Sequence, residues 1–600
     1  MSAVSDRHTE YRRRLDEAGD RSNQLRQRSE RLSALRVAAA LTGVVLAIFA
    51  LATGLISSSW VLLPLAVFLG LVMVHTRTER EIKRVGLIIS WYEDGISRLE
   101  HTWHGKGIQR SDLATDDHPY AADLDLFGPG SLFELLCTAR TQAGEETLAS
   151  WLLAPASSDE TRIRQEAIGE LGPQLDLRED LAVLAGGLRS AVDPERLRTW
   201  AESPSLFDSV AVNAFRIAAI ILSTGCITTF ILWAAADANP LFFWLFVLSI
   251  WGFYAWHGGR IIRVSRELEE PRRELQVLAR LLRRLEDQPA RCDRLVHLRD
   301  SFSAGDLTAS KCIRRLDRLI NWFDAGRNVI FAPLAYGLLW HFHLALAIEA
   351  WRRKAGSQVG RWLESAGEYE AFCSLASYTW EHPDDPWPDL VDEGPRFEGD
   401  DLGHPLLPAE RCARNSVYLG RNVTGWIVSG SNMSGKSTLL RTVGVNAVLA
   451  FCGAPVRASR LTISPLTIGA TIRIEDSLQA GTSRFYAEIS RLKDLMDITR
   501  GDRPLLFLLD EILHGTNSHD RQLGASAVVK SLINAGAIGL VTTHDLALSQ
   551  IADDLGDRVV NMHFEDRLED GKLLFDYQIR PGVVQRGNAL DLMRSIGLDV

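Results

Sequence analysis

Four long uncharged runs stand out in the first half of the chain. They occupy residues 37–56, 60–74, 217–236 and 241–256, and a short polar turn joins the two members of each pair. An apolar run of about twenty residues is long enough to cross a bilayer as a helix. The pattern therefore predicts two transmembrane helical hairpins. An interfacial or re-entrant placement stays open for the fifteen-residue second run, and burial in a soluble core stays open for the set.

Positive charge flanks both hairpins on the same side. By the positive-inside rule, this places both termini and the C-terminal domain in the cytosol. The first run begins late and leads directly into a second, so a cleaved signal peptide is not expected. The sequence thus predicts a multi-pass protein of the cytoplasmic (inner) membrane, in contact with membrane lipid. The flanking cations are Arg12, Arg13, Arg14, Arg26, Arg28, Arg31, Arg36, Arg77, Arg80, Lys83, Arg84, Arg260, Arg263 and Arg266.

The segments around the hairpins are patterned mostly as helices. Residues 78–104 and 131–153 carry apolar positions at helical spacing, and residues 263–327 are rich in Arg, Glu and Leu. A stretch rich in Pro and Asp near residue 383 indicates a linker. The predicted order is a cytosolic amphipathic helix (1–36), hairpin one (37–75), a helical core (76–210), hairpin two (211–257), a helical lever (258–380), a linker (381–402) and a C-terminal domain (403–600).

The C-terminal domain alternates strands with helices. The apolar run 426–429 is followed by a glycine-rich loop and a helix over 438–450, and the runs 505–509 and 539–543 predict two further buried strands. Such alternation predicts a parallel sheet with a site at its C-terminal edge. The expected fold class is an α/β domain of the P-loop type joined to an all-α region that carries two transmembrane hairpins.

A nucleotide-binding motif lies between the first of these strands and its helix. Its glycines let backbone N–H groups close around phosphates, Lys436 reaches the β and γ oxygens, and the Ser437 hydroxyl can ligand Mg²⁺. The strand 505–509 delivers Asp510 as an acidic metal partner and Glu511 as a group that polarises water. The sequence therefore predicts ATP and Mg²⁺ as cofactors and ATP hydrolysis as the activity. The motif residues are Gly430, Ser431, Asn432, Met433, Ser434, Gly435, Lys436, Ser437 and Thr438.

Composition and charge narrow the setting. A hydrophobic content of 46% with 24% charged residues describes a folded chain of several domains. The net charge of -10 argues against a surface coated with basic residues for indiscriminate nucleic-acid binding, although a local groove of arginines can still contact phosphates. Seven scattered cysteines without C-x-x-C spacing favour reduced thiols in the cytosol and no zinc site.

The motif at 430–438 resembles the G-x-N-M-x-G-K-S-T loop of the MutS mismatch-repair ATPases, where the Asn-Met pair is distinctive. Residues 476–488 resemble that family's D-x-L-x-x-G-x-S-T-F-x-x-E signature. Residues 509–520 resemble its D-E-x-x-x-G-T-[ST]-x-x-D stretch, and residues 542–545 its switch-histidine turn. The resemblance is strong in the C-terminal domain and weak in the helical core.

The resemblance implies further residue roles. It implies that His544 senses or stabilises the γ-phosphate, and that Ser483 acts across a dimer interface on the nucleotide of the other subunit. A helix N-cap is the alternative role for Ser483. The family's adenine-stacking aromatic falls near Cys412, so Tyr577 is expected to hold the base instead. A half-buried strand tyrosine is the alternative reading of Tyr577.

The chain also departs from the family. The mismatch-reading domain has no counterpart, and the second hairpin lies where the soluble proteins insert a DNA clamp. Mismatch recognition is therefore not expected, whereas DNA contact through the helical arms remains an implication of the resemblance. His514 stands where the family usually has Arg, and Asn517 where it has Ser.

Together these features indicate a membrane-anchored, MutS-related ATPase that forms a homodimer on ATP and moves its helical arms against an unidentified partner. Two other classes stay open. An ABC-type transport or membrane-remodelling ATPase is disfavoured because the L-S-G-G-Q signature and charged residues in the spans are missing. A nucleotide-regulated membrane scaffold is disfavoured by the intact Glu511.

Overall fold

The structure is a computed structural model that describes residues 2–54, 57–115, 117–185, 193–207, 212–268, 271–304, 307–329, 331–431, 433–473, 484–513, 518–569 and 572–584. The chain divides into two compact units. The first contains Met1–Cys137, Ala149–Leu175 and Ser374–Val600, and the second contains Thr138–Leu148 and Asp176–Cys373.

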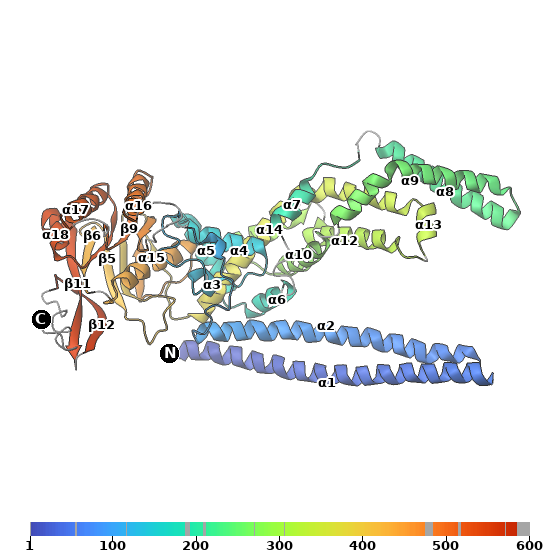
Figure 1. Cartoon of the computed structure of the whole chain (residues 1–600), viewed down its shortest axis with the longest axis horizontal. Helices are drawn as coiled ribbons and strands as arrows, with labels where there is room; N and C mark the ends of the chain where they lie inside the picture. Colours follow the sequence, from blue (N-terminus) through green and yellow to red (C-terminus); the bar gives the residue numbers. More distant parts are fainter. Residues whose placement is uncertain are drawn as a thin grey trace. The chain divides into compact units, whose positions relative to one another are not determined.

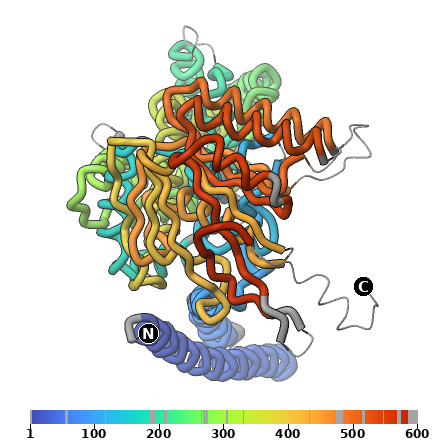
Figure 2. Tube along the Cα trace, turned by 90° about the vertical axis from the view of Figure 1, so that its left-hand side faces the viewer, coloured from blue at the N-terminus to red at the C-terminus, as the bar shows by residue number. Residues whose placement is uncertain are grey.

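The first unit begins with two long antiparallel helices. Helices α1 (Ser2–Thr53) and α2 (Leu62–Leu99) run side by side and are joined by the short helix η1 (Ser58–Val61), as Figures 1 and 2 show. The amphipathic helix expected over 1–36 and the first expected span are thus one continuous helix. The junction contains no proline and is rich in Ala, Leu and Arg, which are good helix formers.

Side chains at the base of this helical pair attach it to the rest of the first unit. The Tyr11 ring packs on Trp380 with 4.6 Å between centroids, and its hydroxyl donates to Glu381 Oε1 over 3.0 Å. Arg98 Nη2 pairs with the same carboxylate at 2.6 Å. A Cβ at Gly95 would stand 2.7 Å from the Tyr11 ring, so a glycine is required there. All of these contacts are buried, and they fix the base of α1 and α2.

A parallel sheet forms the core of the C-terminal domain. Among the described residues it has six strands in the order β12-β11-β6-β10-β9-β8, and all neighbours are parallel except β11 and β12. The strands predicted at 426–429, 505–509 and 539–543 are confirmed as β6, β9 and β10, which lie together in the sheet. The bounds are β6 (Gly425–Ser429), β8 (Thr467–Thr471), β9 (Leu505–Asp510), β10 (Ile538–Thr543), β11 (Val559–Glu569) and β12 (Lys572–Pro581).

Helices cover both faces of this sheet. Strand β9 is apolar as far as Leu509, as a strand buried on both faces requires. Phe507 belongs to the core that α16 (Arg484–Ile498), α17 (Ser518–Asn534) and α18 (Gln550–Leu555) close, and α16 and α17 lie on one side of the strands in Figures 1 and 2. Leu508 faces α15 (Lys436–Cys452), where Gly444 permits close approach because a Cβ there would stand 2.8 Å from Leu508.

The segment expected as a linker, 381–402, contributes two strands to a second sheet. Strands β3 (Asp389–Leu390) and β4 (Phe397–Leu402) join β7 (Arg460–Ile463) and β5 (Asn415–Leu419) in the order β3-β7-β4-β5. The Pro- and Asp-rich signal marks only the turn between the end of a helix at Glu381 and β3.

The expected helix over 131–153 is interrupted. It consists of α3 (Leu132–Leu136) and α4 (Gln142–Leu153), and α5 (Ser158–Leu171) follows. The remaining short helices of the first unit are η2 (Ser111–Leu113), η3 (Leu546–Ser549) and η4 (Gly556–Arg558).

The second unit is helical. The long amphipathic helices expected over 263–327 are shorter pieces, because Pro271 starts a new helix and Pro289 lies in the next turn. A small ladder of β1 (Ser303–Ala304) and β2 (Leu307–Thr308) separates two of them. The helices are α6 (Leu175–Ala185), α7 (Pro194–Glu202), α8 (Val212–Ala236), α9 (Pro240–Leu268), α10 (Pro271–Glu286), α11 (Asp293–Ser301), α12 (Ala309–Ala325), α13 (Ala332–Gly337) and most of α14 (Trp340–Glu381).

Within the described ranges, four helical stretches are long and apolar enough to cross a membrane: Val4–Thr53, Ser59–Leu99, Val212–Ala236 and Pro240–Val264. The buried share of the most apolar 18-residue window is 0%, 6%, 17% and 11%, respectively. Apolar surface of this extent is seldom left in water, and a bilayer is one environment that covers it.

Candidate active site

The glycine-rich loop leaves β6 and leads into the N-terminus of α15. A Cβ at Gly430 would stand 2.7 Å from Ser434 Oγ, and Gly435 has a φ of +101°, so both positions favour glycine. Met433 also has a positive φ, of 71°, and its side chain is 85% exposed. The first N–H groups of a helix lack intrahelical partners and favour anions. The loop therefore leaves the N-terminus of α15 open to an anion such as phosphate.

Lys436 is the first residue of α15 and is almost completely buried. Its Nζ donates to the carbonyl oxygens of Gly430 and Ser431 over 2.8 and 2.9 Å. The same nitrogen lies 3.4 Å from Glu511 Oε1. An ammonium group held in this way stands at the centre of the loop.

Asp510 and Glu511 stand at the C-terminal end of β9, opposite the loop. Because β9 and β10 are parallel with Asp510 beside Thr542, the Thr542 hydroxyl donates to Asp510 Oδ1. The backbone N–H of Glu511 donates to Thr542 Oγ1 over 3.2 Å. Thr542 is fully buried, so one hydroxyl positions both acidic residues.

Glu511 and His544 form a second contact at the same sheet edge. The backbone of Glu511 has a φ of 47°, which turns the chain sharply away from the strand. Its Oε1 lies 3.2 Å from His544 Nδ1, just beyond the end of β10. The Glu511 carboxylate therefore lies between an ammonium group and an imidazole.

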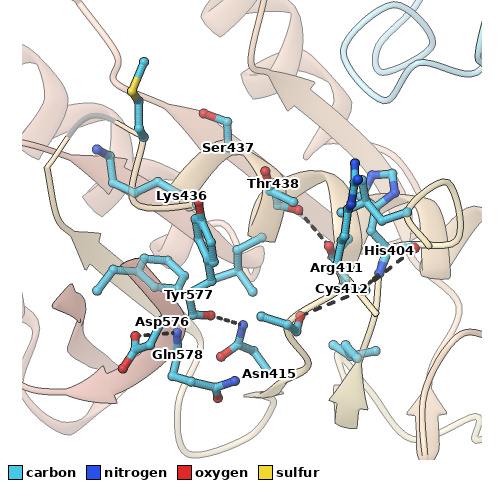
Figure 3. A pocket seen from close by; sticks show the side chains of 18 of the residues that line it. His404, Arg411, Cys412, Asn415, Lys436, Ser437, Thr438, Asp576, Tyr577 and Gln578 are labelled. Atoms are coloured by element: carbon cyan, nitrogen blue, oxygen red, sulfur yellow. Dashed lines mark hydrogen bonds between the residues drawn. The ribbon is translucent and has the colours of Figure 1, made fainter. Parts of the chain in front are cut away.

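A cavity of about 1120 Å³ lies between the glycine-rich loop, the two acidic residues and β12. Figure 3 shows Lys436, Ser437 and Thr438 on one side and Tyr577 from β12 facing them. Asp510 and Glu511 line the same cavity. Its other lining residues are Leu402, His404, Leu407, Glu410, Arg411, Cys412, Ala413, Asn415, Met433, Gly435, Leu439, Thr442, Phe564, Asp576 and Gln578.

Tyr577 is held in the cavity by an irregular stretch of β12. It has a φ of 54°, and its ring lies so close to the loop that a Cβ at Gly435 would stand 3.1 Å from Cδ1. Asn415 bridges the irregularity, because its Nδ2 donates to the Tyr577 carbonyl over 2.9 Å and its Oδ1 accepts from Ile579 N over 2.8 Å. The ring is 43% exposed, which leaves a face available for a planar ligand.

His404 lies at the opposite wall as a neutral group. Burial, together with the Arg441 cation, lowers the pKa of His404 to about 4. Its Nδ1 accepts from Leu406 N over 3.3 Å. His404 therefore contributes no positive charge to the cavity near pH 7.

Most of the candidate site residues identified in the sequence thus meet in one cavity or at its edge. Asn432 and Ser483 lie outside the described residues, as do His514 and Asn517. Sequence reasoning missed Thr542 and Asn415. The signal for Thr542 was its place in a strand that runs parallel to the one ending at Asp510, whereas no local pattern marks Asn415.

Ser437 and Asp510 offer the oxygen ligands that Mg²⁺ prefers. Both line the cavity, and neither is an N or S donor of the kind that selects zinc. Among the residues that the structure describes, no group of three or more His, Cys, Asp and Glu could hold a metal alone. The donor set therefore fits a magnesium ion that takes its remaining ligands from phosphate and water.

This fold and site define a nucleotide-binding domain of the P-loop class. Residues 426–599 match the family described as MutS domain V, so the C-terminal region is homologous to the ATPase domain of MutS proteins. The resemblance seen in the sequence is confirmed for this region.

Similar proteins include a "DNA mismatch repair protein MutS" from Geobacillus thermodenitrificans, 32% identical over 198 residues, which are 32% of this chain and 21% of that protein. An "Endonuclease MutS2" from Thermus thermophilus is 32% identical over 207 residues, 34% of this chain and 27% of that protein. A "DNA mismatch repair protein MutS 2" from Haloarcula marismortui is 33% identical over 202 residues, 33% of this chain and 21% of that protein. The match spans about a fifth to a quarter of these relatives.

Proposed function

We propose that the protein is a membrane-anchored, MutS-related ATPase that binds and hydrolyses ATP at a dimer interface and moves helical arms. The single observation that carries the proposal is the meeting of Lys436, Asp510 and Glu511 around one cavity at the N-terminus of α15, with His544 in contact with Glu511. Phosphoryl transfer depends on positioning the reacting groups and on stabilising their charge, and each of these side chains can serve one of these two needs.

In the proposed reaction, Lys436 exchanges its two backbone carbonyl acceptors for phosphate oxygens. A charge-assisted bond to an anion is stronger than a bond to a neutral carbonyl, so binding favours this exchange. Glu511 then orients and polarises the attacking water, while His544 contacts the γ-phosphate from the end of β10. The 3.2 Å contact between these two side chains supports their joint action on one oxygen.

Mg²⁺ would be held by the Ser437 hydroxyl and, through water, by Asp510. When bound, the ion supplies neutralisation of charge on the β and γ phosphates. Thr542 keeps the Asp510 carboxylate in place, since its hydroxyl donates to that group from inside the sheet.

Pairing of two ATPase domains is supported by apolar side chains exposed near the site. Met433 is 85% exposed in the loop, Tyr486 is 63% exposed on α16, and Leu523 is 60% exposed on α17. We propose that a second copy covers this surface in the ATP-bound state, with Ser483 acting on the nucleotide across the interface.

Membrane anchoring is supported by the four long apolar helices, whose side chains are exposed along most of their length. We place the uncharged runs of α1, α2, α8 and α9 in the inner membrane, with both termini and the ATPase domain in the cytosol. The relatives' names mention mismatch repair and endonuclease activity. For this chain we propose DNA contact without mismatch selectivity, and a further protein partner at the membrane.

ATP turnover of full-length protein in detergent or nanodiscs tests the catalytic part of the proposal. Glu511→Gln should lower kcat by about 10²–10⁴-fold with nucleotide still bound, because it removes a general base but keeps the shape. Lys436→Ala should abolish tight nucleotide binding. Glu410→Gln, at another acidic residue of the cavity wall, is the matched control. Turnover equal to wild type in both Lys436→Ala and Glu511→Gln would refute the site.

Two further measurements address the membrane and DNA. Alkaline carbonate extraction should leave the protein in the pellet, and release into the supernatant would contradict the anchoring. Binding to homoduplex and heteroduplex DNA should be equal and should weaken steeply with salt, as phosphate contacts do. Preference for the heteroduplex would contradict the proposed lack of mismatch selectivity.

A further inference from the structure

A second apolar projection of the second unit lies beside α8 and α9. Helix α12 ends at Ala325, and the chain turns through the short helix α13 into α14. We call residues 326–329 and 331–339 the apolar turn. Between Arg327 and Glu349 the sequence contains no Asp, Glu, Lys or Arg.

The apolar turn exposes large hydrophobic side chains. Val329 is 88% exposed, Leu334 54% and Tyr336 56%, whereas Ala335 and Leu339 are completely buried. One side of the turn therefore packs inward on its own unit, and the other side presents an apolar surface outward. Such a surface needs a cover of matching chemistry.

The turn packs against the second hairpin partway along its length. The Tyr336 ring lies 5.2 Å from the Tyr254 ring of α9, and a Cβ at Gly337 would stand 4.0 Å from Cys226 Sγ of α8. Figure 1 shows α13 next to these helices. Cys226 is ten residues from the end of α8 at Ala236, or about 15 Å along the helix. Gly337 thus lies beside the middle of the predicted span in α8, whereas Tyr336 lies beside the end of the uncharged run 241–256 in α9.

The backbone of the turn is suited to a medium without water. Asn328 O accepts from Phe331 N and Ala332 N over 2.9 and 2.7 Å. Phe331 O accepts from Ala335 N over 2.9 Å, and Leu334 O from Leu338 N over 3.0 Å. Backbone polar groups within a bilayer must be satisfied internally, and the groups that these bonds join meet that condition.

The turn is too short to cross the membrane. Helix α13 has six residues, about 9 Å, against a hydrocarbon thickness of about 30 Å, and α14 then leads back. At the border with α12, Trp340 Nε1 donates to the carbonyl oxygen of Trp322, whose ring is 54% exposed. Exposed Trp is typical of the interface between lipid headgroups and acyl chains.

We propose that the apolar turn is a re-entrant element that enters the bilayer from the cytosolic side, packs on α8 and α9, and contacts lipid acyl chains through Val329, Leu334 and Tyr336. This inference rests on the proposed function in one respect, because it requires α8 and α9 to cross the membrane. Continuity with the exposed apolar surface of those helices selects lipid as the occupant over a protein partner. The helices α12 and α14 are thereby tied to the membrane at their shared end.

Photo-crosslinking in the full-length protein tests the proposal. The residue p-benzoylphenylalanine is placed singly at Val329 or Leu334, in nanodiscs of phosphatidylcholine and phosphatidylglycerol, and adducts are identified by mass spectrometry. Leu245, 50% exposed on α9, is the control for the span itself. Leu307, 37% exposed on β2, is the control for an apolar side chain elsewhere in the same unit.

The expected result is lipid adducts at Leu245 and at both turn positions, and none at Leu307. Adducts at Leu245 without any at Val329 and Leu334 would overturn the re-entrant placement and leave the proposed anchoring intact. Adducts of the turn with polypeptide would overturn lipid as its partner. The absence of lipid adducts at Leu245 as well would overturn the anchoring and the re-entrant element together.

Discussion

The Thr542 hydroxyl donates to the carboxylate of Asp510 across two parallel strands, and it also accepts from the N–H of Glu511. The two acidic residues of the candidate site therefore share one buried positioning group. Parallel register explains the arrangement, since Thr542 lies directly beside Asp510 at the end of the sheet.

Replacing Thr542 by Val should impair hydrolysis more than nucleotide binding. The variant keeps the shape of the side chain but leaves the Asp510 carboxylate without this donor, a loss of about 1–3 kcal/mol, or roughly 5- to 150-fold. We expect a lower kcat and a higher Mg²⁺ concentration for half-maximal turnover, both measured by magnesium titration of ATPase activity. Thr542→Ser retains the hydroxyl and should keep kcat and the magnesium dependence close to wild type. A Thr542→Val variant with wild-type magnesium dependence would contradict the positioning of Asp510 by Thr542.

Replacing Tyr577 by Ala should weaken nucleotide binding. Stacking of a base on an aromatic ring contributes about 1–3 kcal/mol, so Kd for a fluorescent ATP analogue should rise about 5- to 150-fold. Tyr577→Phe should bind as wild type, because the ring rather than the hydroxyl makes the contact. Tyr418→Ala, at an exposed tyrosine on β5 outside the cavity lining, is the control. Equal Kd values for Tyr577→Ala and wild type would show that Tyr577 is only a strand residue.

Glu370 should make the stability of the protein fall as the pH rises from acid to neutral. Its carboxyl group accepts hydrogen bonds from Thr141 Oγ1 and from Arg140 N, and burial raises its pKa to about 7 from 4.5. The folded state thus holds a proton that the unfolded state releases above about pH 4.5. The proton on Glu370 therefore contributes fully to the free energy of unfolding below about pH 4.5. This contribution is lost as the pH rises to about 7, and the free energy no longer changes with this group at higher pH.

The measurement is the thermal midpoint of full-length protein between pH 4.5 and 8. Glu370→Gln should flatten this part of the profile, because the amide does not ionise. The pH-dependent change that it removes from the free energy of unfolding is of the order of 3 kcal/mol. Glu364→Gln, at an exposed neighbour on α14, should keep the wild-type slope. An identical slope in Glu370→Gln would mean that this carboxyl group does not titrate in the range.

The contact of Arg98 with Glu381 should dominate the stability at the base of α1 and α2. Arg98→Ala leaves a carboxylate that is almost fully buried with only the Tyr11 hydroxyl and no cation, which costs about 3–5 kcal/mol. We expect faster proteolysis near the end of α2 and a lower thermal midpoint. Arg21→Ala removes the exposed pair with Glu81 further along the same helices and should have little effect. Equal effects of the two substitutions would contradict this assignment.

The sequence predicts the central strands and the phosphate loop well, because their signals lie in residues that are neighbours along the chain. Residues 505–509 are apolar throughout and two acids follow, so the strand and its acidic end are readable within seven positions. The acidic strand β4 lacks such a signal, because its composition disfavours strands and its partners β5 and β7 come later in the chain. The sequence therefore does not reveal β3 and β4, whose stability comes from pairing over a long sequence separation.

The candidate site shows the same division. Lys436, Asp510 and Glu511 carry motif spacing and could be read directly. The roles of Thr542 and Asn415 depend on neighbours in space, 32 and 162 residues away, which no window along the chain contains. The sequence does not single out the apolar turn, because Pro333 and Gly337 interrupt its hydrophobic pattern and His341 and His343 follow it closely.

Because α1 is one continuous helix, it fixes the distance between its buried base and its uncharged run. From Tyr11, which is bound at the base, to Val37, where the uncharged run begins, 26 residues of continuous helix measure about 39 Å. If the uncharged run lies in the lipid, as proposed, this part of α1 is a spacer that holds the contacts of Tyr11 about 39 Å from the membrane surface. A partner that binds beside this part of α1 would then lie within that distance of the membrane.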